Sequence, residues 1–287
     1  MGALTDLAGL LRCPVPHHAG EAALAPDGDG RTLGCPDGHR FDLARQGHVN
    51  LLSRPAGANA DTAEMVAARE RFLAGGHYAP LTRALGDVLA DLPEDALLLE
   101  SGAGTAHHLR GVLGAGPRRG LALDVSVAAV RRAARADPRI GAVVADSWEP
   151  WPVRTGCLDA VLAVFAPRNP AETARVLRPG GVLVVATPEP GHLRELRESS
   201  SLLGIEEGKV ERLREQLGAG FDEEEVDVVD HLLHLDPTQA RDLVLMGPNG
   251  HHLSPVELAG LWPEGASTRV SVRVARYRVR PPTRSRG

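Results

Sequence analysis

Two glycines that follow an apolar run are the first residues with a clear chemical use. Gly102 and Gly104 stand between the run Ala96–Leu99 and a predicted helix that contains His108. Glycine lets the backbone approach a ligand closely, and the first amide groups of a helix have no partners within it, so such a turn suits a nucleotide-like ligand. A short Gly-x-Gly turn is also an ordinary connection between a strand and a helix. The turn alone therefore leaves both interpretations open.

Two further polar groups follow the next two apolar runs. Asp124 comes about 20 residues after the glycines, where a carboxylate can accept hydrogen bonds from both hydroxyls of a ribose. Asp146 and Ser147 end the third run, where an adenine amine can find an acceptor. His107 occupies the position of the third glycine in the dinucleotide pattern. The set therefore predicts an adenosine-containing cofactor and disfavours a nicotinamide dinucleotide.

Strands that alternate with helices must position these groups. Because the carboxyl ends of parallel strands meet at one edge of a sheet, the three groups are expected to share one crevice. The turn Arg178–Gly181 precedes the fifth strand, as it often does in class I methyltransferases, although Pro-Gly by itself explains a type II turn. We predict an α/β fold with a class I methyltransferase Rossmann-like sheet. Its five strands are expected at Ala96–Leu99, Gly120–Leu123, Ala142–Ala145, Ala160–Val164 and Gly181–Ala186.

The two ends of the chain differ from this middle. Two helices, Thr62–Ala74 with Asp61 as its cap and Ala79–Leu89, are predicted before the first strand. Period-two alternation in Val226–His231 and Thr268–Val279 predicts antiparallel strands near the C-terminus. We expect a small module over residues 1–53, a linker with helices over 54–90, and the cofactor-binding domain over 91–287.

Composition limits the class of protein. The chain has 287 residues, a formal net charge of −5 and three cysteines, an odd number that suits a reducing compartment better than a disulfide framework. No run of about 18 apolar residues is present, so we expect a cytoplasmic protein without a membrane partner. The acidic balance argues against a broadly basic nucleic-acid binder. Arginines that cluster near the C-terminus, at Arg273, Arg276, Arg278 and Arg280, are interpreted as a solvated strand face.

Several ordered segments resemble the large-subunit ribosomal RNA guanine-N1 methyltransferases, including the macrolide (tylosin-type) resistance enzymes of actinomycetes. The resemblance covers about residues 13–195 and is weak in the last third of the chain. The segments that carry it are Cys35–Asp42 (CPDGHRFD), Gln46–Leu52 (QGHVNLL), Asp61–Arg69 (DTAEMVAAR), Gly76–Leu81 (GHYAPL), Phe165–Pro170 (FAPRNP) and Gly191–Leu193 (GHL).

The resemblance implies S-adenosylmethionine as the methyl donor, ribosomal RNA as the acceptor, a zinc-binding N-terminal module and a homodimer. It assigns contacts with the methyl donor to Tyr78, to the turn that carries Gly102, Gly104 and His108, and to Asp124 and His192. Glu100 stands where the family usually has Asp, and one extra methylene still allows a carboxylate to organise the turn. Tyr78 and His192 taken alone would be read as a packing residue and a solvated loop residue.

The family's zinc pattern, Cys-x2-Cys followed by Cys-x3-His, is only partly present. Pro16 replaces the second cysteine, and His17 follows it. Cys13, His17, Cys35 and His39 would still make an acceptable tetrahedral zinc site. The alternative is that the metal has been lost and that packing holds the module.

Two residues after the fourth strand are candidates for handling the acceptor. Phe165 could stack on a flipped base while Asn169 reads its edge, although ordinary packing at a strand end explains Phe165 equally well. Guanine N1 carries a proton near neutral pH, so its methylation needs a base, which we leave unassigned. Glu172 is interpreted as a charge at a helix N-terminus. The alternatives to rRNA methylation are a small-molecule methyltransferase of secondary metabolism on the same scaffold and, less favoured, a non-catalytic binding protein.

Overall fold

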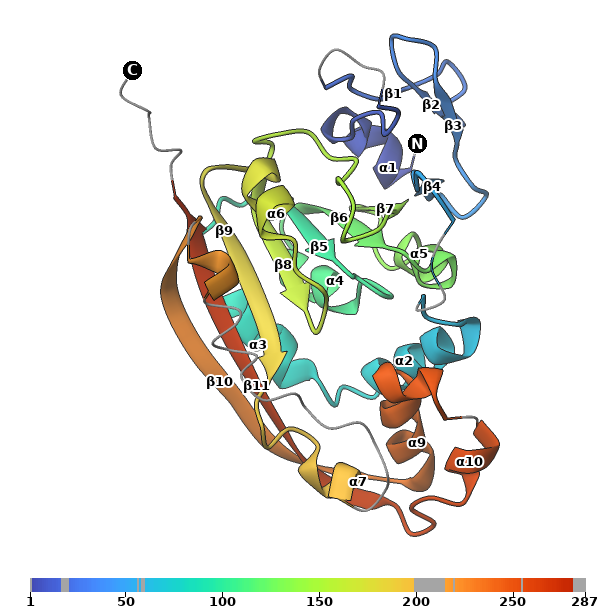
Figure 1. Ribbon diagram of the computed structural model, residues 1–287, viewed down its shortest axis with the longest axis vertical. Helices are drawn as coiled ribbons and strands as arrows, with labels where there is room; N and C mark the ends of the chain where they lie inside the picture. Colours follow the sequence, from blue (N-terminus) through green and yellow to red (C-terminus); the bar gives the residue numbers. More distant parts are fainter. Residues whose placement is uncertain are drawn as a thin grey trace.

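A computed structural model describes residues 2–16, 21–55, 57, 60–198, 215–218, 220–253 and 255–280. The strands of its main sheet follow the order β10-β11-β9-β8-β5-β6-β7-β4 (Figure 1). The parallel part consists of β4 (Val49–Asn50), β5 (Leu97–Ser101), β6 (Arg119–Asp124), β7 (Ile140–Val144), β8 (Leu158–Val164) and β9 (Leu177–Pro188). The α/β sheet predicted from the alternating apolar runs is thereby confirmed.

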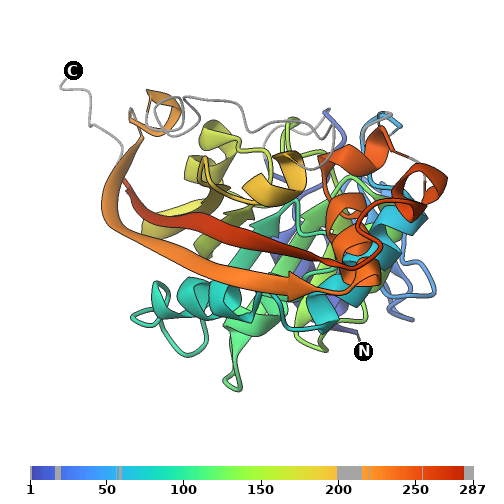
Figure 2. The same cartoon turned by 90° about the horizontal axis from the view of Figure 1, so that it is seen from below.

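Two long antiparallel strands extend the sheet beyond β9. β11 (Ala266–Val279) pairs with β9, and β10 (Phe221–Leu235) pairs with β11. The pair curves along one side of the molecule (Figure 2). Both strands are longer than the alternation in the sequence indicated, and the predicted antiparallel character of this end of the sheet is confirmed.

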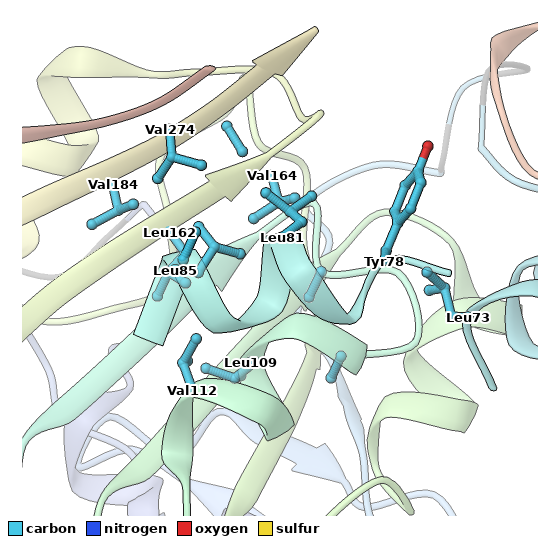
Figure 3. Close-up of a cluster of buried hydrophobic side chains, with 14 of the residues drawn as sticks. Leu73, Tyr78, Leu81, Leu85, Leu109, Val112, Leu162, Val164, Val184 and Val274 are labelled. Atoms are coloured by element: carbon cyan, nitrogen blue, oxygen red, sulfur yellow. The ribbon is translucent and has the colours of Figure 1, made fainter. Parts of the chain in front are cut away.

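Helices cover both faces of the sheet and share its apolar side chains. On one face, α3 (Ala79–Asp87) lies against β10 and β11, and α4 (His107–Leu113) lies against β5 and β6. Figure 3 shows Leu81 and Leu109 among the buried side chains of the cluster that these helices share with the sheet. On the other face lie α1 (Ala3–Leu7), the 3-10 helix η1 (Ala8–Leu10) and α6 (Pro170–Val176). Each buried Leu or Val contributes about 1.5–3 kcal/mol, which explains why these runs set the fold. The remaining helices are α2 (Ala63–Ala74), α5 (Val127–Ala133), α7 (Arg194–Glu198), α9 (Pro237–Leu245), η2 (Pro248–His251) and α10 (Pro255–Ala259).

The cap of α2 differs from the prediction. The side chain of Thr62, rather than that of Asp61, accepts the hydrogen bond from the Met65 amide at 3.2 Å. Asp61 instead pairs with Arg69, about two turns along the helix. The prediction failed because both residue types are good caps and their order in the sequence does not decide which one turns toward the helix.

The N-terminal residues form a small antiparallel sheet, β1 (Ala25–Pro26), β2 (Thr32–Gly34) and β3 (Arg40–Asp42). Leu11, Leu24 and Leu33 from this part are buried in the same cluster as Leu121 and Val143 of the main sheet. The chain then enters the main sheet through β4, which lies beside β7. The predicted linker over residues 54–59 lies partly outside the described residues.

The arginines of β11 are paired rather than free. Carboxylates of β10 face them across the strand pair, and Asp91 adds a bidentate contact to Arg276 at 2.6 and 2.7 Å. This stripe is therefore a neutralised strand face. The prediction of a solvated face is wrong for Arg276, which is 6% exposed because it packs against its partners Asp91 and Glu224. The pairs with β10 are Arg269–Asp230, Arg273–Glu223, Arg276–Glu224, Arg278–Glu224 and Arg280–Asp222. Among the described residues, no helix is long and apolar enough to cross a membrane.

Candidate active site

The glycine turn contacts the loop after β8 and the end of β6, at the carboxyl edge of the sheet. Gly102 and Gly104 have φ values of +67° and +54°, in the left-handed region that favours glycine. A Cβ on Gly102 would lie 2.6 Å from the Cβ of Ala166, so the turn packs directly against the loop after β8. The amide of Ala103 donates to the Leu123 carbonyl at 2.9 Å and ties the turn to β6. Only glycine satisfies both the backbone geometry and the packing at position 102.

Asp124 lies at the end of β6, where the sequence placed it. Its two carboxylate oxygens accept hydrogen bonds from the amides of Gly104 and Ser126, both at 2.8 Å. Burial raises the pKa of Asp124, and the two amides oppose that rise. Each carboxylate oxygen has a second lone pair, so the group can still accept from two ribose hydroxyls.

Glu100 is buried beneath the turn, only 2% exposed, and does not face solvent at the sheet edge. Its side chain is buried, and one oxygen accepts from the amide of Leu109 at 3.1 Å. Burial raises the pKa of Glu100 to about 8. The residue therefore organises the start of α4, which is the role that its longer side chain was expected to retain.

His108 is connected by hydrogen bonds, through the side chain of Thr82, to the backbone of Tyr78. Its Nδ1 lies 2.8 Å from the Thr82 hydroxyl, which donates to the Tyr78 carbonyl at 3.3 Å. Because that hydroxyl has one hydrogen, it must accept from the imidazole, which fixes the proton on Nδ1. Burial lowers the pKa of His108 to about 3, so the ring is neutral. His108 thus supports the backbone that carries Tyr78.

Three aromatic rings that are distant in sequence meet at this edge. The ring centroids of Tyr78 and Phe165 are 6.0 Å apart, and that of His192 lies 6.5 Å from Tyr78 and 5.7 Å from Phe165. The Ser271 amide donates to His192 Nδ1 at 3.2 Å, so the imidazole proton lies on Nε2. Burial lowers the pKa of His192 to about 4 and keeps the ring neutral. The ring that taken alone resembled a solvated loop residue is a buried, oriented donor.

Phe165 and Asn169 sit in the loop between β8 and α6. Phe165 is 42% exposed and has a φ of +53°, an uncommon conformation for a bulky residue and one that is often found at functional sites. Asn169 caps α6 by accepting from the Glu172 amide at 3.2 Å, and its Nδ2 donates to the Ser147 carbonyl at 3.3 Å. Asn169 therefore links this loop to the loop after β7.

Asp146 and Ser147 follow β7 at the same carboxyl edge of the sheet. Asp146 accepts from the Trp148 amide at 2.9 Å, and the hydroxyls of Ser147 and Ser101 are 3.0 Å apart.

Burial alone would raise the pKa of Glu172, but hydrogen bonds from Arg175 and from the Trp151 amide lower it. Glu172 is committed to these partners in the first turn of α6, as predicted.

Arg69 belongs to this site and was missed by the sequence reasoning. A Cβ on Gly104 would lie 2.8 Å from a guanidinium nitrogen of Arg69, so the guanidinium lies against the turn. Arg69 also donates to the Met246 carbonyl at 2.7 Å, which connects the turn to α9. The only signal in the sequence was its place at the end of the Asp61–Arg69 segment.

Three of the four predicted metal ligands lie together in the N-terminal part. The Nδ1 atom of His39 is 3.8 Å from Cys13 Sγ and 3.4 Å from Cys35 Sγ. Tetrahedral zinc with bonds of about 2.3 Å to sulfur and 2.0–2.1 Å to nitrogen would place such ligand atoms roughly 3.6 Å apart. The three side chains therefore fit zinc, and all their ligand atoms lie within 4.8 Å of one another. His17, the fourth predicted ligand, lies outside the described residues.

Comparison with known proteins found a family that matches the N-terminal part and relatives that match most of the chain. A zinc-ribbon family described as "RlmA, N-terminal" matches residues 11–56. The 23S rRNA (guanine(748)-N(1))-methyltransferase of Streptomyces fradiae is 46% identical over 255 residues, which cover 87% of this chain and 88% of that protein. A protein of Micromonospora griseorubida named as a 23S rRNA (guanine-N(1)-)-methyltransferase is 43% identical, and the match covers 95% of this chain and 98% of that one.

The fold has solved counterparts at much lower identity. The methyltransferase in complex with the Haloferax volcanii Trm112 activator is 20% identical, with a TM-score of 0.50 over 80% of this chain and 100% of that one. At this identity the similarity supports the shared architecture of the sheet and helices.

Proposed function

Because the chain belongs to the family of 23S rRNA guanine-N1 methyltransferases, we propose that it methylates N1 of a guanine in large-subunit ribosomal RNA, with S-adenosylmethionine as donor. The observation that carries the proposal is the 46% identity over 87% of the chain to a relative named for this reaction. By the same relation, we propose that the target corresponds to guanine 748, the nucleotide in that relative's name.

We propose that the cofactor lies along the carboxyl edge of the sheet. We propose that Asp124 binds the ribose hydroxyls, that Asp146 and Ser147 contact the adenine, and that the turn at Gly102 and Gly104 lies against the rest of the cofactor. When bound, S-adenosylmethionine supplies an electrophilic methyl group on its sulfonium. The task of the protein is to hold the acceptor nitrogen in line with that group.

The aromatic residues have a proposed role around the reacting groups. Tyr78 and His192 enclose the donor, and the neutral His192 ring offers its Nε2 hydrogen to it. Phe165 is partly exposed beside them, so we propose that it stacks on the target guanine after that base leaves its helix. Asn169 fixes the Phe165 loop, and its second Nδ2 hydrogen can reach the base edge. The proton on N1 must leave before or during transfer, and Glu172 cannot take it because Arg175 and an amide already occupy its carboxylate.

The proposal also includes a bound zinc ion and a homodimeric assembly. We propose that zinc bound by Cys13, Cys35 and His39 holds the N-terminal module. We also propose a homodimer that acts in the cytoplasm and protects its own ribosomes from macrolides, as the resemblance implies. The outward face of β10 supports a protein contact, since Val228 and Leu232 are 47% and 56% exposed there.

Methyl transfer to RNA tests the proposal directly. The purified chain is incubated with tritiated S-adenosylmethionine and unmodified 23S rRNA, and the product is mapped by primer extension. We expect one labelled guanine, modified at N1, and no label in RNA with adenine at that position. Absence of transfer to RNA, despite measurable donor binding, would refute the proposal and favour a small-molecule acceptor.

A further inference from the structure

Trp148 is the most exposed aromatic side chain among the described residues. It is 68% exposed, whereas Trp151, three residues later, is 1% exposed. Exposing a tryptophan forfeits the large stabilisation that its burial would give, so an isolated exposed ring beside a binding site suggests a partner. Trp148 directly follows Asp146 and Ser147, at the carboxyl edge of the sheet where the methyl donor is proposed to bind.

The loop that carries Trp148 is held on both sides. The amide of Trp148 donates to Asp146 at 2.9 Å. The Ser147 carbonyl accepts from the indole of Trp151 at 3.1 Å and from Asn169 at 3.3 Å. The Trp151 amide donates to Glu172 at 2.6 Å. The backbone is thus fixed while the Trp148 ring faces solvent, so a flat partner would bind it at a small cost in backbone entropy.

The position of Trp148 relative to Phe165 points to the kind of partner. Trp148 and Phe165 lie in two loops that are in contact, because the Ser147 carbonyl, one residue before Trp148, accepts from Asn169 Nδ2, four residues after Phe165. Asn169 connects the two loops and fixes their relative position.

The charges beside this ring are paired. Arg54 is 70% exposed and pairs with Glu149, the neighbour of Trp148. The arginines of β11 are likewise engaged by carboxylates of β10, so that stripe does not offer a free phosphate-binding surface. The exposed ring itself is the feature that suits single-stranded nucleic acid, whose bases stack on aromatic side chains.

We propose that Trp148 stacks on an unpaired base of the bound ribosomal RNA, a base other than the guanine held by Phe165. The inference rests on the proposed function and adds a second base contact to it. Such contacts give shape selectivity for a loop whose bases are already unstacked.

The test uses the full chain and an RNA hairpin of the 23S region that contains guanine 748. Base stacking on an aromatic ring is lost in Trp148→Ala, which should weaken RNA binding roughly 5- to 100-fold in fluorescence anisotropy. Trp148→Phe should retain most of the affinity. Val256→Ala, which trims an 83% exposed apolar side chain on α10, should leave it unchanged. Donor affinity, measured by calorimetry, should be equal in all four proteins.

Intrinsic fluorescence gives a second readout, because Trp148 is far more exposed than Trp151 or Trp262. RNA should protect wild-type emission from acrylamide quenching, and this protection should disappear in Trp148→Ala. Equal RNA affinity of wild type and Trp148→Ala would overturn the inference. The inference would also be overturned if Trp148→Ala lowered only the affinity for the methyl donor, or if it changed only the oligomeric state measured by sedimentation. If wild type itself neither binds nor methylates the hairpin, the proposed function fails first.

Discussion

Replacement of Gly102 by alanine tests the packing of the glycine turn against the loop after β8. The left-handed backbone at φ +67° costs a non-glycine residue about 1–2 kcal/mol. The new Cβ would lie 2.6 Å from the Cβ of Ala166, an overlap that only backbone movement can relieve, at about 1–3 kcal/mol. We therefore expect a loss of about 2–5 kcal/mol in the free energy of unfolding. The turn at Gly102 is itself proposed to lie against the methyl donor, so donor affinity should fall as well.

Gly180 provides a matched control within the same chain. Its φ is +79°, but nothing lies within 4 Å of a Cβ placed there, so Gly180→Ala should cost only the backbone component of about 1–2 kcal/mol. Urea unfolding followed by circular dichroism gives both free energies, and calorimetry gives the donor affinities. Equal destabilisation by the two variants, with unchanged donor affinity in Gly102→Ala, would refute the reasoning about the overlap.

Three other changes probe the site, the metal and the strand pair. The pKa of Glu100 lies at about 8 in the folded chain against an ordinary 4.5, so the folded state holds a proton that the unfolded state loses in this range, and stability should fall as pH rises from 4.5 to 8. Glu100→Gln should flatten that fall, and equal slopes of Tm against pH in both proteins would contradict it. Cys35→Ser should lower the zinc content measured by mass spectrometry from one ion per chain toward zero, together with Tm, whereas Cys157→Ser should leave the metal in place. Arg276→Met should lower the free energy of unfolding by about 1–3 kcal/mol, because Asp91 and Glu224 lose their shared partner, and an unchanged urea midpoint would show that the pairs contribute nothing.

The parallel core was predictable because its strands are buried on both faces. Runs such as Ala160–Val164 have no exposed side chain, and this continuous apolar character is visible in the sequence. The carboxyl-end positions of Gly102, Asp124 and Asp146 then followed from the geometry of parallel sheets. Short elements such as β4, with two residues, carry no periodicity and could not be predicted.

The contacts that orient the site residues could not be predicted from the sequence, because they join residues that are far apart in the chain. The hydrogen bond between Thr82 and His108 joins residues 26 apart, and that between Ser271 and His192 joins residues 79 apart. Neither Thr82 nor Ser271 belongs to a motif, so only the packed structure shows which tautomer each imidazole adopts. The resemblance pointed to His192, and the structure supplied the reason that it is a donor.

The entry of the chain into the main sheet through β4 makes the N-terminal part a structural component of the catalytic half. β4 covers the backbone edge of β7, and Leu11, Leu24 and Leu33 are buried together with Leu121 and Val143. A chain shortened to the catalytic half would expose that edge and an apolar face in water, where both favour aggregation. Metal loss at Cys13, Cys35 and His39 would act on the same interface from within. The zinc ligands can therefore differ from the family's pattern, as Pro16 does, whereas the module that they hold is needed to cover the main sheet.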